Sequence, residues 1–214
     1  MTFPTTGILD SFNRADAGPP PSADWSIWQF NDQFRVLSNQ ATAQAGASSE
    51  LVANYWDTST FGADTEAYTT IAAPNGDGSS SYGVIARIQT GDLSDGYLVE
   101  WTAGNTIDIY RIDNGAYTQL GASNTGQTLN AGDKIGIEII GSTIKAYKNE
   151  GAGWSQVGTS RTDSTYSAAG YVGLHCYQGG ATLISMDDFG GGTVVVAGGG
   201  QPARTMHQFR MRKQ

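Results

Sequence analysis

Short segments in which apolar and polar residues alternate follow one another along most of the chain, and they limit the folds open to it. Ile135, Ile137 and Ile139, for example, occupy every second position of 134–141. Such a period of two is typical of an antiparallel strand with one buried face. No window of a dozen residues keeps apolar positions at the three-and-four spacing of a helix, so no helix is predicted.

The predicted strands share this alternation and are separated by Gly, Asn, Asp and Ser. They span 25–28, 34–37, 50–56, 65–71, 82–88, 97–101, 106–113, 117–123, 134–141, 143–149, 154–159, 171–177 and 182–189. In one of them, Tyr97, Val99 and Trp101 alternate with Leu98 and Glu100. About a dozen short strands in 214 residues indicate one all-β domain, a sandwich or barrel.

Turn residues support the antiparallel arrangement. Asp113-Asn114-Gly115 separates two predicted strands, and Asn-Gly supplies the positive φ angles of a tight β-hairpin. We therefore expect 106–113 and 117–123 to pair directly.

The composition excludes several classes of protein. The single cysteine, Cys176, cannot form an intrachain disulfide, and with His175 and His207 it provides too few ligands for a zinc site. A net charge of −8 argues against a nucleic-acid-binding protein. No stretch approaches the roughly 18 apolar residues of a membrane span, and residues 1–12 lack the basic and apolar regions of a signal peptide.

Basic residues are concentrated at the C-terminus. Four of the twelve lie in 204–213, which contains no acid, and this leaves eight basic against twenty acidic residues, a net charge of −12, in 1–203. Such asymmetry favours a tail that docks on an acidic partner.

Glycine triplets mark the predicted boundary between body and tail. We expect a domain over 1–190, a Gly-rich hinge over 191–200 and a basic docking tail over 201–214. The residues predicted to bind the partner are Arg204, Met206, Phe209, Arg210, Met211 and Arg212.

Two motifs carry a resemblance to a known family. Leu9-Asp10-Ser11-Phe12-Asn13-Arg14-Ala15-Asp16, followed by Trp25, and Ile184-Ser185-Met186-Asp187-Asp188-Phe189 resemble the concanavalin A-like lectin/glucanase superfamily, in particular laminin-G-like jelly-roll modules of bacterial and bacteriophage surface proteins. The resemblance covers about 7–190 and implies a jelly-roll β-sandwich of two antiparallel sheets. It also implies that the first and last strands pair, which would bring 10–12 beside 186–189. The ending 201–212 resembles the short basic C-termini of some phage structural proteins.

Catalytic residues are not predicted. Hydrolases of this superfamily carry two glutamates within five or six residues of one strand, and here no two of the five glutamates fall so close. Glu100 and Glu138 could still form an acid pair between strands, but isolated solvent-facing glutamates are the better interpretation. There is no Gly-x-Ser-x-Gly elbow either.

Aromatic residues provide a candidate glycan-binding face. In 171–177 the alternation puts Val172, Leu174 and Cys176 on the core side and leaves Tyr171, His175 and Tyr177 together on the other. Aromatic rings stack on sugars and also anchor protein partners, so we name these three residues and Trp101 as glycan-binding candidates. A decorated sheet surface or a partly buried histidine is the structural alternative, and most tryptophans are expected in the core.

Cofactors are not required by the pattern. The turns that contain Asp77 and Asp95 are the best candidates for a calcium site, and the resemblance implies that relatives often bind one calcium. Asp and Asn are, however, ordinary turn residues, and neither turn has the full spacing of a calcium loop.

Three functions remain open. The leading hypothesis is a non-enzymatic phage virion protein, a capsid decoration or fibre-type module made without a signal peptide, located on the virion surface and anchored by its tail to other virion proteins, with self-association and adhesion to surface glycans as further roles. The alternative is a free carbohydrate-binding lectin. A divergent glycoside hydrolase is the third.

Overall fold

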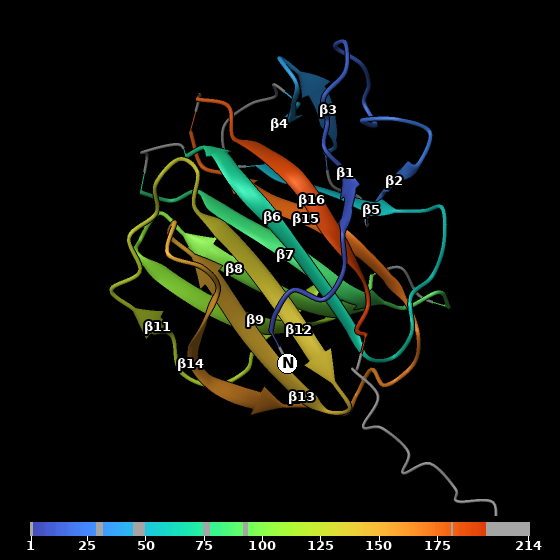
Figure 1. The fold of residues 1–214 in the computed structure, drawn as a ribbon, viewed down its shortest axis with the longest axis vertical. Helices are drawn as coiled ribbons and strands as arrows, with labels where there is room; N and C mark the ends of the chain where they lie inside the picture. The colour runs from blue at the N-terminus through green and yellow to red at the C-terminus, as the bar shows by residue number, and fades with distance from the viewer. Residues whose placement is uncertain are drawn as a thin grey trace, which may run out of the picture.

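The computed structural model describes residues 2–28, 32–44, 50–74, 78–91, 94–180 and 182–195, and all regular structure in these residues is β-strand. The strands form two antiparallel eight-stranded sheets, which lie one behind the other in Figure 1. Within these ranges there is no helix long and apolar enough to span a membrane. The prediction of an all-β, two-sheet jelly-roll sandwich is confirmed.

Sheet A runs in the order β14-β13-β12-β6-β16-β4-β3, and β1 also pairs with β16. Its strands are β1 (Ile8–Asp10), β3 (Phe34–Leu37), β4 (Gln40–Ala43), β6 (Thr65–Ala73), β12 (Lys134–Ile140), β13 (Thr143–Asn149), β14 (Ser155–Thr162) and β16 (Ser185–Thr193).

Sheet B runs in the order β10-β9-β8-β7-β15-β5-β2, and β11 also pairs with β9. Its strands are β2 (Trp25–Ile27), β5 (Glu50–Trp56), β7 (Ser81–Ile88), β8 (Gly96–Thr102), β9 (Thr106–Asp113), β10 (Ala116–Gln119), β11 (Asn124–Thr125) and β15 (Tyr171–Gln178).

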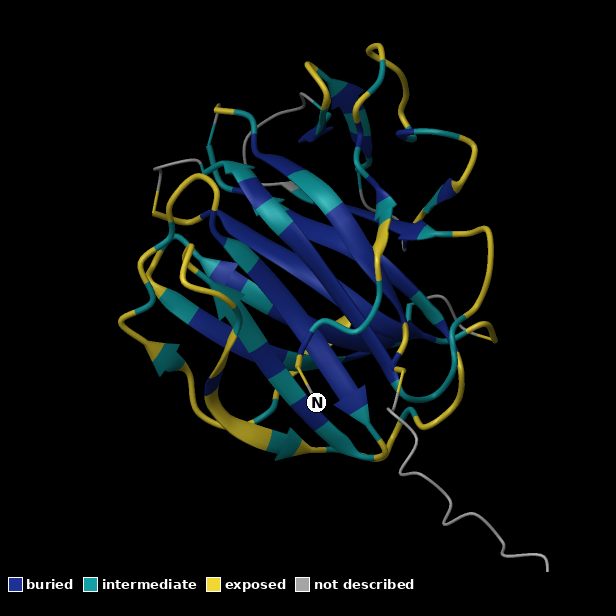
Figure 2. Cartoon of the chain, in the orientation of Figure 1, coloured by how far each residue is buried: buried dark blue, intermediate teal, exposed yellow. Residues whose placement is uncertain are grey.

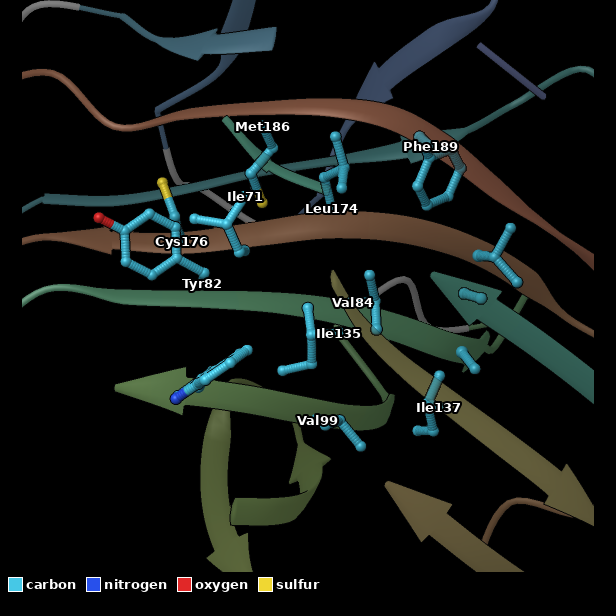
Figure 3. Packing of buried hydrophobic residues seen from close by; sticks show 14 of the residues in the cluster. Ile71, Tyr82, Val84, Val99, Ile135, Ile137, Leu174, Cys176, Met186 and Phe189 are labelled. Atoms are coloured by element: carbon cyan, nitrogen blue, oxygen red, sulfur yellow. The ribbon is translucent and has the colours of Figure 1, made fainter. Parts of the chain in front are cut away.

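The core lies between the two sheets and is built from the apolar side of each alternating strand. In Figure 3, Val84 and Val99 of sheet B lie near Ile135 and Ile137 of sheet A, and Leu174 of sheet B lies near Ile71 and Met186 of sheet A. The central strands are therefore buried, whereas the edge strand β14 and the loops are exposed (Figure 2). Burial of apolar surface stabilises the folded state by about 25 cal/mol per Å², and it is the main force that holds the sheets together.

Cys176 also lies on the core side and is a free, fully buried thiol. Together with the burial of Val172 and Leu174, this confirms the expected inner face of β15.

The first and last strands pair as the resemblance implies. Asp10 of β1 lies opposite Phe189 of β16, and Ile8 lies opposite Gly190. The Asp10 carboxylate accepts hydrogen bonds from Trp25 Nε1 at 2.8 Å and from both terminal nitrogens of Arg14 at 2.6 and 2.9 Å. The motif that carried the resemblance thus closes one end of the sandwich.

Hairpin turns follow their sequence signals. Asn114 and Gly115 have φ angles of 46° and 78° and join β9 to β10, as expected. Ser38 and Asn39, with φ angles of 54° and 62°, join β3 to β4 in the same way. β4 was not predicted, because Ala41 and Ala43 are small and make its alternation with Gln40 and Thr42 only weakly apolar.

The described chain continues as part of sheet A beyond the predicted domain boundary at 190. β16 continues to Thr193, and the backbone N–H of Val194 donates to the carbonyl of Asp64 at 2.9 Å. Gly191 packs closely on β6, where a Cβ would stand 2.7 Å from the Glu66 carbonyl oxygen. Close approach of two backbones therefore explains these glycines better than a hinge does. The rest of the predicted hinge and the whole predicted tail lie outside the described residues.

Candidate functional site: the concave face of sheet B

Polar side chains form a row across the outer face of sheet B. Asp108 on β9 is directly opposite Glu100 on β8, Glu100 is opposite Gly83 on β7, and Gly83 is opposite His175 on β15. These residues occupy the strand positions that alternate with the core residues, so their side chains share the outer face. The row thus places two carboxylates and an imidazole beside one another.

Gly83 lies between Glu100 and His175 in the row and has no side chain, so the side chains of these two residues can approach each other. A Cβ at this position would stand 2.7 Å from Leu98 Cδ1 and 2.8 Å from the Val99 carbonyl oxygen. Without a side chain there, Glu100 Oε1 approaches His175 Nδ1 to 3.7 Å and also accepts a short hydrogen bond from the Ser81 hydroxyl.

The outer face of sheet B is curled inward. β10 and β15 are separated by three strands, and in a flat sheet their backbones would be roughly 19 Å apart. The Tyr117 hydroxyl on β10 nevertheless lies 3.1 Å from His175 Nε2 on β15, and the Tyr117 ring packs edge-on against Tyr110 with 5.9 Å between centroids. The contact between Tyr117 and His175 requires a strong curvature with this face on the inside, and we call it the concave face.

Burial sets the protonation of the groups in the row. Desolvation raises the pKa of Glu100, and the negative charge of Asp108 adds to this effect, whereas the hydrogen bond from Ser81 opposes it. Desolvation also lowers the pKa of His175 to about 4, so the imidazole is neutral at pH 7.

The pKa values of the tyrosines on this face are raised, whereas an activated phenol would have a lowered pKa. Burial raises the pKa of Tyr110 to about 12, with smaller contributions from the charges of Glu100 and Asp108. Burial raises the pKa of Tyr117 as well. Both phenols therefore stay protonated near neutral pH. At the same pH, His175, whose pKa is about 4, is a weak general base.

Asp108 and Tyr117 give the face its recognition chemistry. The Asp108 oxygens accept hydrogen bonds from the Thr106 hydroxyl at 2.9 Å and from Gln119 Nε2 at 3.1 Å. Tyr117 is 38% exposed, and its hydroxyl is directed to His175 Nε2. Carboxylate acceptors beside aromatic rings suit hydrogen bonding and stacking better than acid–base chemistry.

The four predicted glycan-binding residues have different positions. Trp101, predicted as a glycan-binding candidate, is fully buried on the core side and donates from Nε1 to the Gln127 carbonyl at 2.8 Å, in agreement with the core position expected for most tryptophans. His175 lies on the predicted face but is fully buried, because Tyr117 and Trp28 pack over it. It is thus buried more completely than the partly buried histidine that the sequence analysis gave as the structural alternative.

Tyr171 and Tyr177 lie on the same side of β15 as His175 and are half-buried. Tyr171 packs against the ring of Tyr55 at 4.9 Å, at the end of the face away from Asp108. Their role in glycan binding stays a prediction.

Sequence reasoning missed Asp108, Tyr110 and Tyr117. The sequence did contain a signal for Asp108. A turn at 103–105 sets the register of the β8–β9 hairpin so that Thr102 faces Thr106. In this register Glu100 faces Asp108. No local signal could have indicated that Tyr117 reaches His175.

The acid pair considered between Glu100 and Glu138 does not form. Glu138 belongs to sheet A, where it lies opposite Glu66, and its carboxylate accepts a hydrogen bond from Lys145 Nζ at 2.7 Å. The two glutamates are thus on different sheets.

The two predicted calcium ligands do not form a site in the described residues. Asp77 lies outside them, and Asp95 Oδ1 accepts a hydrogen bond from the Asn114 backbone N–H at 2.7 Å. In the described ranges no three Asp, Glu, His or Cys side chains gather in a manner that would hold a metal. The side chains of the described residues do not provide the six to eight oxygens that calcium takes.

Comparisons with solved structures match this fold. The carbohydrate-binding module CBM66 from Bacillus subtilis superposes with a TM-score of 0.60 at 17% identity, covering 78% of this chain and 93% of that one. The exoplasmic/lumenal domain of VIP36 in its Ca²⁺/Man3GlcNAc-bound form gives a TM-score of 0.59 at 10% identity, covering 81% of this chain and 85% of that one.

A protein of unknown function with a galectin-like fold, also from Bacillus subtilis, gives a TM-score of 0.57 at 11% identity and covers 85% of this chain and 97% of that one. No protein-family model matches the sequence, and no curated protein sequence matches it. None of the three structural descriptions names a virus or a phage. What these similarities establish is the fold: a jelly-roll β-sandwich of the type found in concanavalin-like and galectin-like lectins.

Proposed function

We propose that this protein is a non-enzymatic carbohydrate-binding module whose glycan binds on the concave face of sheet B. The observation that carries the proposal is the convergence of Asp108, Glu100, Tyr110 and Tyr117 on one inwardly curled face. The description of one similar structure as a carbohydrate-binding module, and of another as a mannose-containing complex, supports it.

Tyr117 and Asp108 are the residues we expect to contact the sugar. The Tyr117 ring provides a stacking surface, and the second lone pairs of the Asp108 oxygens can accept sugar hydroxyls. His175 and Glu100 act behind them, because His175 holds the Tyr117 hydroxyl in place.

A glycan array with the purified full chain tests the proposal. Binding should be lost or weakened at least about tenfold in Tyr117→Ala, because aromatic anchors carry much of the energy of such sites. Ile8→Ala, at a 54% exposed position of sheet A, is the matched control and should bind like the unaltered chain. An array without a single ligand, or full binding by Tyr117→Ala, would contradict the proposal.

Calcium dependence and hydrolysis are tested in the same assay. Binding should persist in EDTA, because the described carboxylates form no cation site. No reducing sugar should be released from a bound glycan. Release that Asp108→Asn abolishes would replace the binding function by a hydrolytic one.

The basic C-terminal segment supports a separate proposal, the docking of this module on an acidic assembly such as a virion. It rests on the charge contrast between four basic residues in 204–213 and a net charge of −12 in 1–203. Light scattering of the chain with and without 201–214 tests it: an oligomer that becomes a monomer on truncation would show that the segment joins like chains. A monomer in both cases would exclude self-assembly through this segment.

A further inference from the structure

We infer that the glycan recognised by the concave face of sheet B is electrically neutral, and that the same glycan is rejected when one of its hydroxymethyl groups is replaced by a carboxylate. This inference rests on the proposed function and adds to it the chemical class of the ligand. It follows from the position of every basic side chain in the body of the protein.

The face has two acidic side chains and no basic one beside them. Glu100 and Asp108 lie directly opposite each other on β8 and β9, and the imidazole of His175 beside them is neutral at pH 7 because burial lowers its pKa. Side chains that face each other in this way have Cβ atoms about 5 Å apart. A ligand carboxylate placed beside them would meet the negative charge of Asp108, and no cation in this partly desolvated site would offset the repulsion.

Sheet B has two cations, and both are engaged elsewhere. The Arg87 guanidinium is buried and donates to the carbonyls of Ala63, Tyr166 and Gly141 at 2.6, 2.9 and 2.7 Å. Arg111 lies toward the other face of β9.

There, the Arg111 guanidinium forms ion pairs with Asp113 and Asp163, both at 2.8 Å. Neither arginine is therefore available to neutralise a carboxylate bound next to Asp108.

The other basic residues of 1–203 belong to sheet A, its edge or its loops. They are Arg14, Arg35, Lys134, Lys145, Lys148 and Arg161. The internal segments outside the described residues contain no lysine or arginine in their sequence. Only the basic residues of 204–213 remain, and in the described chain no lysine or arginine forms an ion pair with Glu100 or Asp108.

Hydrogen bonding favours the same class of ligand. The Asp108 oxygens already accept from Thr106 and Gln119, and each carboxylate oxygen has a second lone pair. Sugar hydroxyls can donate to these lone pairs, whereas a ligand carboxylate only accepts and cannot donate to Asp108 or Glu100.

The test uses matched ligands. Oligosaccharides of glucose, galactose and mannose are presented beside the same oligosaccharides oxidised at C6 to uronic acids, and the full chain is assayed at pH 7 and low salt. We expect binding to at least one neutral member and at least about tenfold weaker binding to its oxidised counterpart. Higher salt should narrow the difference, because it screens repulsion between the carboxylates.

Two variants connect the selectivity to the face. Asp108→Asn removes the negative charge of Asp108 and should reduce the discrimination severalfold. Glu150→Gln removes the same charge from an exposed ion pair with Lys148 at the sheet A edge and should leave discrimination unchanged.

Equal or tighter binding of the oxidised member would overturn the inference while leaving the proposed function intact. Discrimination that survives unchanged in Asp108→Asn would do the same. If neither the neutral nor the oxidised members bind, the proposed function itself fails.

Discussion

The hydroxyl of Tyr117 lies 3.1 Å from Nε2 of His175, although three strands separate the strands that carry them. This hydrogen bond joins the edge of sheet B to its centre and holds the curvature of the concave face. Because His175 is fully buried, the bond also satisfies a ring nitrogen that water does not reach.

Tyr117→Phe should therefore destabilise the protein without removing much apolar surface. The change leaves His175 Nε2 buried without a partner, which costs about 1–3 kcal/mol in the free energy of unfolding. Urea denaturation measures this loss. Tyr177→Phe, on the same strand as His175, is the matched control and should change stability by less than about 0.5 kcal/mol; equal effects of the two changes would argue against the cross-sheet bond.

Stability should decrease in acid because of His175. Burial lowers its pKa from an ordinary 6.5 to about 4, so between these values the unfolded chain binds a proton that the folded chain refuses. The contribution of the neutral His175 to the free energy of unfolding is therefore fully present above pH 6.5. It falls by up to about 3 kcal/mol as the pH drops toward 4.

His175→Gln removes this titration while retaining a hydrogen-bonding side chain next to Tyr117. The difference in unfolding free energy between the unaltered chain and the variant should shrink as the pH falls from 6.5 to 4. Groups that do not contact position 175 contribute equally in both proteins, so a change in this difference reports on His175 and on its contact with Glu100. A difference that stays constant across this window would show that the imidazole is not desolvated.

The sequence contains the alternation and the register that place Glu100 and Asp108 in the candidate site, but it does not contain the curvature that completes the site. Alternation alone assigns Trp101 to the core and Glu100 to the opposite face, so naming Trp101 as a glycan contact disregarded the pattern. The register of the β8–β9 hairpin likewise fixes Asp108 opposite Glu100. The burial of His175 depends on Tyr117 arriving from a strand far across the sheet, and a pattern of period two contains no information about how strongly a sheet curls.

Arg87 supports the sandwich from a buried position. Its guanidinium donates to three backbone carbonyls, and Arg87→Met would leave all three without a donor in a place that water does not reach. We expect a loss of about 3 kcal/mol or more in unfolding free energy. Arg161 also donates to three carbonyls but is half-exposed, so Arg161→Met should cost less than about 1 kcal/mol because water replaces its bonds. Chemical denaturation of the pair compares the two, and similar losses would mean that burial does not set the cost.

The N-terminal segment crosses the outer face of sheet A and is held at two points. Thr5 and Thr6 donate their backbone N–H groups to Glu66 Oε1 at 2.6 and 2.7 Å. Phe3 stacks on Tyr147 with 4.2 Å between ring centroids and meets Trp154 edge-on at 4.9 Å. The ring fits because Gly136 below it has no side chain: a Cβ there would collide with Phe3.

Phe3→Ala should cost about 3 kcal/mol in unfolding free energy, since the Phe3 side chain is 7% exposed and its removal leaves an unfilled space between aromatic rings. It should also shift tryptophan emission to longer wavelength, because Trp154 loses its cover. Ile8→Ala, five residues further and 54% exposed, is the control and should change neither stability nor emission. If Phe3→Ala unfolds like the unaltered chain but the emission shifts, the segment covers sheet A without stabilising it, and the Glu66 contacts alone would hold it in place.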